Sequence, residues 1–126
     1  MTAVGEQLPD LVIEASVKNI VATAIASRDY QDVHHDIATA QQKGSKTIFT
    51  NILTSNGYVL RYVTDHFGPR TVIKTSKIRL GVPNYAGDTM TMRGEVTAVE
   101  GNRVTVAVRG SNSLGDHVIG TVGVEL

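Results

Sequence analysis

The spacing of apolar residues constrains the fold of this 126-residue chain more than any other feature, because the period of that spacing changes along the sequence. Residues 52–67 have a helical period, with a largely apolar face at intervals of one, three and four residues: Ile52, Asn56, Val59, Leu60, Val63 and Phe67. Thr50 or Asn51 can cap this helix, and Gly68-Pro69 stops it. The sequence that follows is strand-like in the segments 71–82, 88–99, 103–111 and 117–126.

A strand is also expected before the helix. The segment VKNIVATAIA, residues 17–26, is rich in β-branched side chains, which favours a strand. One long apolar helix and an antiparallel sheet of about five strands must then bury each other. The sequence therefore predicts an α+β fold, a single hotdog domain over residues 1–126 in which the sheet wraps around one long central helix. Its edge strands need a second copy or a related chain to pair with, which predicts an oligomer.

Composition excludes several classes of function. Lysine plus arginine number 12 and aspartate plus glutamate also number 12, so there is no excess positive charge to attract nucleic acid. No apolar run approaches the roughly 20 residues of a membrane helix, and the first residues lack the profile of a secretory signal. Cysteine is absent, which removes disulfides and thiolate nucleophiles. We expect a soluble, cytoplasmic protein that binds neither membrane nor nucleic acid.

Ionisable residues are concentrated in one loop. The segment SRDYQDVHHD, residues 27–36, carries three aspartates and two adjacent histidines with hardly any apolar residue. Asp29 and His34 are close enough along a turn to point into one cleft and to hold a water molecule between them. After the loop, Asp36 can cap a short helix that ends at Gly44.

A carboxylate and an imidazole that share a water can hydrate an α,β-unsaturated thioester. A base takes a proton from the water as it attacks the β-carbon, and an acid delivers a proton to the α-carbon. Negative charge gathers on the thioester oxygen, where the N-terminus of a buried helix can supply hydrogen-bond donors. The first turn after Thr50 is the candidate for that helix end.

Three motifs resemble those of the MaoC-like (R)-specific hydratases. The segment DYQDVHHD, residues 29–36, is similar to the family motif D-x-N-P-x-H-x-D, although Gln31 and Asp32 replace its central Asn and Pro. Residues 83–88, PNYAGD, look like its P-V-x-x-G-D turn. Residues 48–51, IFTN, occupy the place of its histidine-glycine helix start, with Asn51 at the glycine. The resemblance implies that Asp29 and His34 are catalytic and that the backbone amide of Asn51 faces the thioester oxygen.

A more specific resemblance covers nearly the whole chain. The phrases RDYQDVHHD, GSKTIFTNILT, RYVTDHFGP, RLGVP and NSLGDHV look like the smaller subunit of the actinobacterial steroid (cholesterol) side-chain enoyl-CoA hydratases. This resemblance implies hydration of a steroid side-chain 2-enoyl-CoA to the (R)-3-hydroxyacyl-CoA, without a cofactor, as the catalytic subunit of a heterodimer or heterotetramer. It implies a larger MaoC-like partner subunit, and is compatible with a zinc-ribbon or OB-type extra domain on that partner and a link to a thiolase-like aldolase.

Other interpretations of these residues stay open. The chain could be a hotdog acyl-CoA thioesterase, or a non-catalytic scaffold subunit of a hydratase complex. Asp29 and His34 could belong to a purely structural loop. A metal site could use Asp32, His34, His35 and Asp36, although no remote ligand set is apparent and we predict no metal.

Several other residues are expected to lie outside the site. We expect structural roles for His66 and His117, a place outside the site for His35, and a turn at Gly87-Asp88. Four basic residues could meet the phosphates of coenzyme A: Arg70, Lys74, Lys77 and Arg79.

Overall fold

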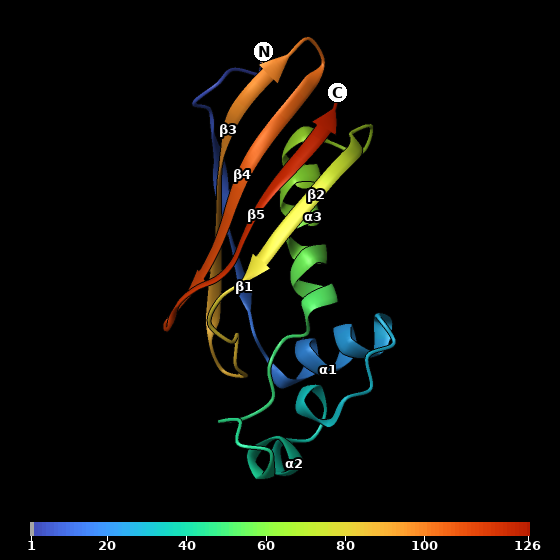
Figure 1. The fold of residues 1–126 in the computed structure, drawn as a ribbon, viewed down its shortest axis with the longest axis vertical. Coiled ribbons are helices and arrows are strands. Elements are labelled where there is room, and N and C mark those ends of the chain that lie inside the picture. Colours follow the sequence, from blue (N-terminus) through green and yellow to red (C-terminus); the bar gives the residue numbers. More distant parts are fainter. Residues whose placement is uncertain (1) are drawn as a thin grey trace.

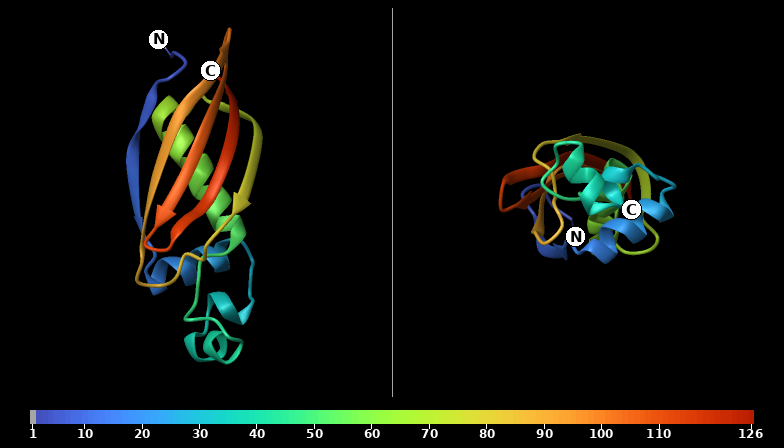
Figure 2. Two further views of the ribbon diagram at one scale, coloured as in Figure 1. Left: turned by 60° about the vertical axis from the view of Figure 1, so that its left-hand side comes forward. Right: turned by 90° about the horizontal axis from the view of Figure 1, so that it is seen from below.

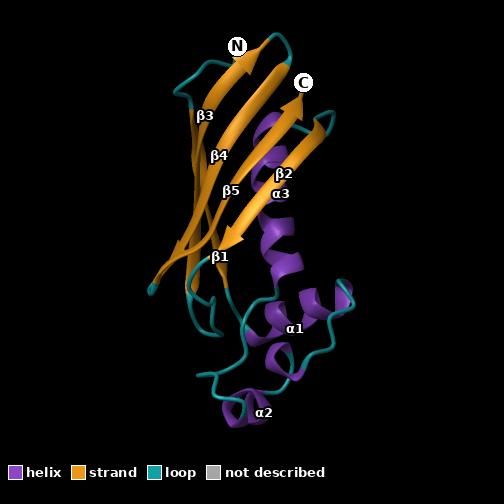
Figure 3. Cartoon of the chain, in the orientation of Figure 1, coloured by secondary structure: helices purple, strands orange, loops and turns teal. Residues whose placement is uncertain are grey.

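The computed structural model describes residues 2–126 and contains one antiparallel sheet and three α-helices (Figures 1 and 3). The five strands lie in the order β1-β3-β4-β5-β2, so β1 and β2 are the edges. In chain order the elements are β1 (Gln7–Glu14), α1 (Val17–Ala26), the 3-10 helix η1 (Asp32–His34), α2 (Ile37–Gln42), α3 (Ile52–Phe67), β2 (Val72–Leu80), β3 (Thr89–Glu100), β4 (Arg103–Asn112) and β5 (Gly115–Glu125).

The sheet curves around α3, as the two views of Figure 2 show. Val59 and Val63 of α3 are completely buried, as are the inward-facing Val106 and Val122 of β4 and β5. Along β4 the buried residues alternate with less buried ones, as the period of two in the sequence predicts. The predicted α+β hotdog fold, a sheet wrapped around one long helix, is confirmed.

Helix α3 has the predicted bounds, but its buried face is rotated from the predicted one. Asn51 is the N-cap, and Gly68 ends the helix with a φ of 98°, a left-handed conformation that favours glycine. Ile52, predicted on the buried face, is 53 % exposed. The buried residues of α3 are Thr54, Ser55, Val59, Tyr62 and Val63. Two of them, Thr54 and Ser55, are polar residues near the start of the helix.

The strand predicted at residues 17–26 is wrong, because this segment is helix α1. The side chain of Ser16 accepts a hydrogen bond from the backbone amide of Asn19 and so caps the helix. Ile20 and Ala24, four residues apart, are its buried residues. The fifth strand is instead β1, which pairs with β3 and whose register shifts between Leu8 and Leu11. The weak helix penalty of β-branched residues was outweighed by a cap and a buried stripe.

The segment between β1 and α3 forms a helical cap beyond the sheet, drawn below it in Figure 1. A second, small cluster of buried residues holds it together: Ala15, Ile20, Ala40 and Ile48. Asp36 caps α2 through the backbone amide of Thr39, and Gly44 has a φ of 93°, both as predicted. This cap carries the loop rich in aspartate and histidine to the N-terminal end of α3.

In residues 2–126, none of the helices is both long and apolar enough to cross a membrane.

Candidate active site

A cavity of about 350 Å³ lies at the N-terminal end of α3 and contains the three predicted site residues, Asp29, His34 and Asn51. We call it the site cavity. The loop after α1, the start of α3, the end of β2 and the start of β5 contribute to its walls. The other residues that line it are Gln31, Phe49, Thr50, Ile52, Leu80, Gly81, Val82, Pro83 and His117.

Asp29 is positioned by the end of α1. The amide of Arg28 donates to the carbonyl of Ile25 at 2.9 Å, and the amide of Asp29 donates to the carbonyl of Ala24 at 2.8 Å. This pair of bonds is a Schellman motif, which normally has glycine in its left-handed position. Here Arg28 occupies that position with a φ of 55°. Asp29 is thus the first residue after a hydrogen-bonded helix end, and its carboxylate, with Oδ1 accepting from the Gln31 amide at 3.3 Å, faces the cavity.

His34 is buried and held in one orientation. Its Nδ1 lies 2.7 Å from the carbonyl oxygen of Phe49, and because a carbonyl can only accept, Nδ1 carries the proton. The ring also contacts the Phe49 ring edge-to-face, with 4.9 Å between the centroids. The other ring nitrogen, Nε2, lies 3.5 Å from Oδ2 of Asp29. The structure therefore brings the predicted pair together, with a ring nitrogen and a carboxylate oxygen facing each other.

The Asn51 side chain contacts the same carboxylate. Its Nδ2 donates to Oδ2 of Asp29 at 3.2 Å and to the hydroxyl of Ser27 at 2.9 Å, while its Oδ1 accepts from the hydroxyl of Thr54. Our sequence prediction concerned only the backbone amide of Asn51. The signal for this second contact was the departure from the family's glycine, since a glycine has no side chain to offer.

The first turn of α3 begins at the site cavity without a side-chain cap. The side chain of the N-cap Asn51 is engaged with Asp29, and within residues 2–126 the helix has no side-chain capping hydrogen bond. The first amides of a helix have no intrahelical acceptor, and they carry the positive end of the helix dipole. Asn51 and Ile52 both line the cavity. This end of the helix can therefore stabilise a negatively charged oxygen.

A turn between β2 and β3 supports the start of α3. The amide of Thr50 donates to the carbonyl of Asn84 at 3.1 Å, and the Asn84 side chain donates back to the Thr50 hydroxyl at 3.2 Å. Asn84 is itself buried and accepts a hydrogen bond from Asn112 at 3.1 Å. Gly87 has a φ of 94°, so the predicted turn at Gly87-Asp88 is confirmed.

The residues considered as metal ligands have separate partners. Asp32 pairs with Lys43 at 3.5 Å, His35 donates from Nε2 to the carbonyl of Asp29 at 2.6 Å, and Asp36 caps α2. His35 thus supports the loop from behind, outside the cavity lining, as predicted. Over residues 2–126 no group of three or more His, Asp or Glu side chains has a metal-binding arrangement.

The remaining predicted residues lie on other elements. Lys74, Lys77 and Arg79 are exposed on β2, and Arg70 is exposed in the preceding turn. Lys74 pairs with Glu125 at 3.8 Å. His117, for which the sequence indicated only a structural role, is buried and lines the site cavity.

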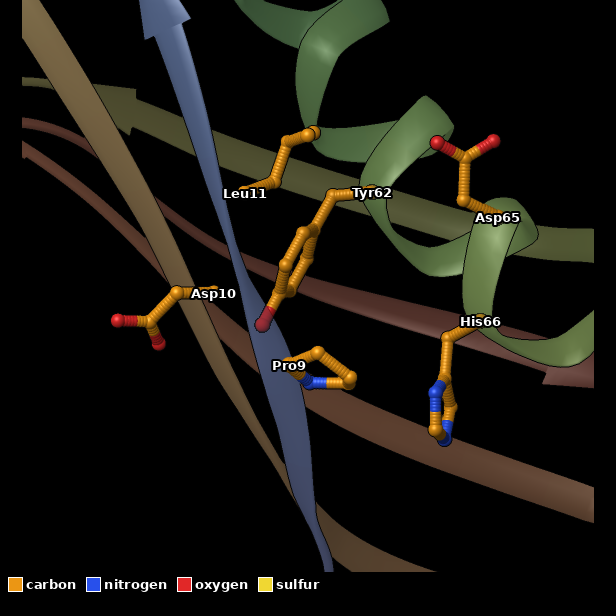
Figure 4. Close-up of a pocket in the computed structure, with 6 residues that line it drawn as sticks. All are labelled: Pro9, Asp10, Leu11, Tyr62, Asp65 and His66. Atoms are coloured by element: carbon orange, nitrogen blue, oxygen red, sulfur yellow. The ribbon is translucent and has the colours of Figure 1, made fainter.

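A second cavity, of about 240 Å³, lies between β1 and the C-terminal half of α3, and we call it the β1 cavity (Figure 4). His66, expected to be structural, belongs to it and pairs with Glu6 at 3.0 Å. Its lining residues are Pro9, Asp10, Leu11, Tyr62, Asp65 and His66.

A long helix wrapped by a curved antiparallel sheet defines a hotdog-fold protein, and here a cavity lies at the start of that helix. Solved structures with the same fold include an (R)-hydratase from A. caviae involved in PHA biosynthesis, which is 21 % identical with a TM-score of 0.91 over 99 % of this chain and 97 % of the other. A MaoC-like dehydratase is 18 % identical with a TM-score of 0.89, over 99 % of this chain and 41 % of the other. No protein-family model matches the chain.

Two comparisons are much more specific. The chain is 57 % identical to the 3-oxo-4,17-pregnadiene-20-carboxyl-CoA hydratase beta subunit of Mycobacterium tuberculosis, over 97 % of this chain and 95 % of the relative. It also matches a chain in the crystal structure of the ChsH1-ChsH2 complex from Mycobacterium tuberculosis, with 55 % identity and a TM-score of 0.98 over 100 % of this chain and 99 % of the other. The chain therefore belongs to the family of this hydratase beta subunit.

Proposed function

We propose that this chain is the catalytic subunit of an enoyl-CoA hydratase, with Asp29 and His34 as its acid-base pair. Membership of the hydratase family supports the reaction. The choice of these two residues is supported by the 3.5 Å approach of His34 Nε2 to Asp29 Oδ2, inside a cavity and beside the first turn of α3, which has no side-chain cap. No other pair of groups lining this cavity joins a carboxylate to an imidazole in this way, among the described residues.

The tautomer of His34 determines how water would bind. With the proton on Nδ1, the Nε2 of a neutral ring is an acceptor, and the ionised carboxylate of Asp29 is an acceptor too. A water between them donates one O–H to each and keeps its lone pairs for the β-carbon of the enoyl group. The water oxygen bonds to that carbon, the pair takes one proton, and one proton is delivered to the α-carbon. The net change is the addition of one water.

The backbone of Asn51 supplies the second requirement of this reaction. As the β-carbon is attacked, electrons move to the thioester oxygen, which becomes an enolate oxygen. An amide at the start of α3, with the helix dipole behind it, stabilises that charge in a partly enclosed site. The Asn51 side chain holds the Asp29 carboxylate at the same time, so one residue links the acid-base pair to the oxyanion-binding amide.

We propose a steroid side-chain enoyl-CoA as the substrate class and a larger MaoC-like subunit as the partner. The name of the 57 % identical relative gives that protein a steroid carboxyl-CoA substrate and a beta-subunit role, and the ChsH1-ChsH2 structure is a complex. The edge strand β2 supports assembly, since its apolar Val72 and Ile73 are 50 % and 39 % exposed. Leu80, at the end of β2, is exposed and also lines the site cavity, so a partner on this edge would meet the cavity mouth.

The test is hydration of 2-enoyl-CoA thioesters by the chain alone and by its complex with the proposed larger MaoC-like subunit. Products are identified by mass spectrometry, because hydration adds one water and retains the thioester, whereas a thioesterase releases free coenzyme A. The complex rebuilt with a His34→Ala chain is expected to lose about two to four orders of magnitude in turnover while still assembling. Undiminished turnover in that complex would assign the chemistry to the partner and make this chain a scaffold.

A further inference from the structure

We propose that His117 is a positioning residue of the hydration site, which fixes the first turn of α3 relative to the opposite wall of the site cavity through a bridge to Ser55 and Val82. The proposal rests on the proposed function. His117 is 2 % exposed and Ser55 is completely buried. Its imidazole Nε2 lies 2.7 Å from the Ser55 hydroxyl and its Nδ1 lies 2.7 Å from the carbonyl oxygen of Val82.

The direction of each hydrogen bond follows from the partners. The Val82 carbonyl can only accept, so Nδ1 carries a proton. Burial lowers the pKa of His117 below its usual 6.5, with the bond to Val82 acting in the opposite sense, so the ring is neutral near pH 7. Nε2 of a neutral ring then accepts. The Ser55 hydroxyl lies 2.7 Å from this nitrogen and 3.3 Å from the carbonyl oxygen of Asn51, so it donates at the shorter distance, to Nε2.

The bridge connects two walls of the cavity that are distant in sequence. Ser55 lies one helical turn after Asn51, whose carbonyl accepts from the Ser55 amide at 3.1 Å. Val82 follows β2, in the segment whose amides bond to β5: Gly81 donates to the His117 carbonyl at 2.7 Å and Val82 to the Asp116 carbonyl at 3.0 Å. The ring of His117 thus joins the helix that carries the proposed oxyanion donor to the wall formed by Gly81 and Val82.

This arrangement predicts a specific kinetic effect. Ser55 is not a lining residue of the cavity, and it would act only through the position of the Asn51 amide. A displaced amide weakens contact with the enolate oxygen, a charge that develops in the transition state, more than it weakens binding of the ground-state thioester. Loss of the bridge should therefore lower kcat and leave KM nearly unchanged.

The experiment compares Ser55→Ala, His117→Phe and the double variant, each assembled with the unmodified partner, using an enoyl-CoA that the wild-type complex hydrates. We expect kcat to fall on the order of 10-fold in each single variant. The double variant should fall no further than the worse single one, because both changes remove the same bridge. Tyr62→Phe is the control, since it removes a different buried hydrogen bond, from its hydroxyl to the Leu8 carbonyl, outside the site cavity.

The results distinguish the possible failures. Unchanged kcat in Ser55→Ala and His117→Phe, with only reduced thermal stability, would show that the bridge is structural and would overturn the proposal. A raised KM with unchanged kcat would overturn it as well. If His117→Phe does not fold, Ser55→Ala still decides, because alanine suits a helix interior. Failure of the wild-type complex to hydrate any enoyl-CoA would instead refute the proposed function.

A measurement without substrate tests the bridge itself. The ¹⁵N shifts of the His117 ring at pH 7 should be those of a neutral imidazole with its proton on Nδ1. A doubly protonated ring, or a proton on Nε2 alone, would contradict the assigned hydrogen bonds and overturn the proposal.

Discussion

The site cavity and the β1 cavity lie toward opposite ends of α3, and both contain an aspartate and a histidine. In the site cavity, Asp29 and His34 face each other, and each is oriented by neutral donors or acceptors of the surrounding backbone and amide groups. In the β1 cavity the ionisable groups are paired with residues outside its lining. Asp65 pairs with Arg61 at 3.3 Å, and His66 pairs with Glu6.

Figure 4 shows how the β1 cavity differs in geometry, with Asp10 and Asp65 on opposite sides of the Tyr62 ring. Asp10 pairs with Arg93 at 3.4 Å. Each of these three groups is already engaged by a partner outside the cavity, so it has little capacity left to bind or to exchange a proton with a substrate. Such exposed ion pairs also contribute little to stability. An acid-base site therefore needs a carboxylate and an imidazole that face each other in one cavity, and the presence of aspartate and histidine is not sufficient.

The largest expected difference between the two cavities is in turnover. Asp29→Asn should lower kcat by about two to four orders of magnitude, because the amide cannot accept a proton from water as a carboxylate does. Asp65→Asn, a matched change in the β1 cavity, should alter kcat less than about twofold, since it removes only a surface ion pair. Steady-state hydration by the assembled complex measures both. Equal losses of kcat in the two variants would show that the two cavities do not differ in catalytic importance.

Two glycines give a second contrast. A Cβ on Gly81, in the wall of the site cavity, would overlap the backbone oxygen of Asp116, and one on Gly94 would lie 2.8 Å from the Tyr62 ring. Each alanine variant should lose about 1–3 kcal/mol of unfolding free energy through overpacking. Only Gly81→Ala should also lower kcat, because it displaces a wall of the site cavity. Urea denaturation and hydration assays provide the two readouts, and a kcat loss in Gly94→Ala would count against the separation.

The site cavity also contains a buried histidine that should make stability depend on pH. Burial lowers the folded-state pKa of His117 below the unfolded value of about 6.5. Below pH 6.5 the unfolded chain therefore binds more protons, so this stability is present above pH 6.5 and is lost as the pH falls through the folded pKa. The slope contributed by one such group is at most about 1.4 kcal/mol per pH unit. Urea denaturation from pH 7 to 5 should show a shallower loss in His117→Phe than in wild type, and identical slopes would refute this prediction.

The smallest expected effect is in the β1 cavity. Tyr62→Phe removes the hydrogen bond to the Leu8 carbonyl, which should cost about 0.5–1.5 kcal/mol of unfolding free energy. Turnover of the folded complex should remain that of wild type, because Tyr62 contacts no residue of the acid-base pair. A large change in kcat at a temperature where the variant is folded would show that the two cavities communicate.

Elements with strong local signals were predicted well. The bounds of α3 follow from its apolar spacing and from Gly68-Pro69, and the four later strands match to within a few residues. The cap at Asp36 and the approach of Asp29 to His34 also follow from short spacings. These features depend on residues near one another in the chain, so a sequence pattern can contain them.

Features that depend on tertiary packing were missed. Strand β1, with Pro9 and Asp10 at its centre and a shifted register, has no regular alternation to recognise. The β-branched residues of helix α1 favour a strand by local propensity. The burial of Ile20 and Ala24, which stabilises the helix, depends on tertiary packing and is not visible in the sequence. The bond between His117 and Ser55 joins residues 62 positions apart, and no spacing rule predicts such a pair.

The left-handed backbone conformation of Arg28, at the end of α1, bears on how much free energy is needed to position Asp29. Holding a residue other than glycine at a φ of 55° costs on the order of 1 kcal/mol, and the folded chain meets that cost before any ligand arrives. The backbone of Asp29 is consequently preorganised by two hydrogen bonds of the helix terminus. In the proposed reaction, an incoming acyl group would meet a carboxylate that needs no rearrangement, so its binding free energy would remain available for lowering the activation barrier.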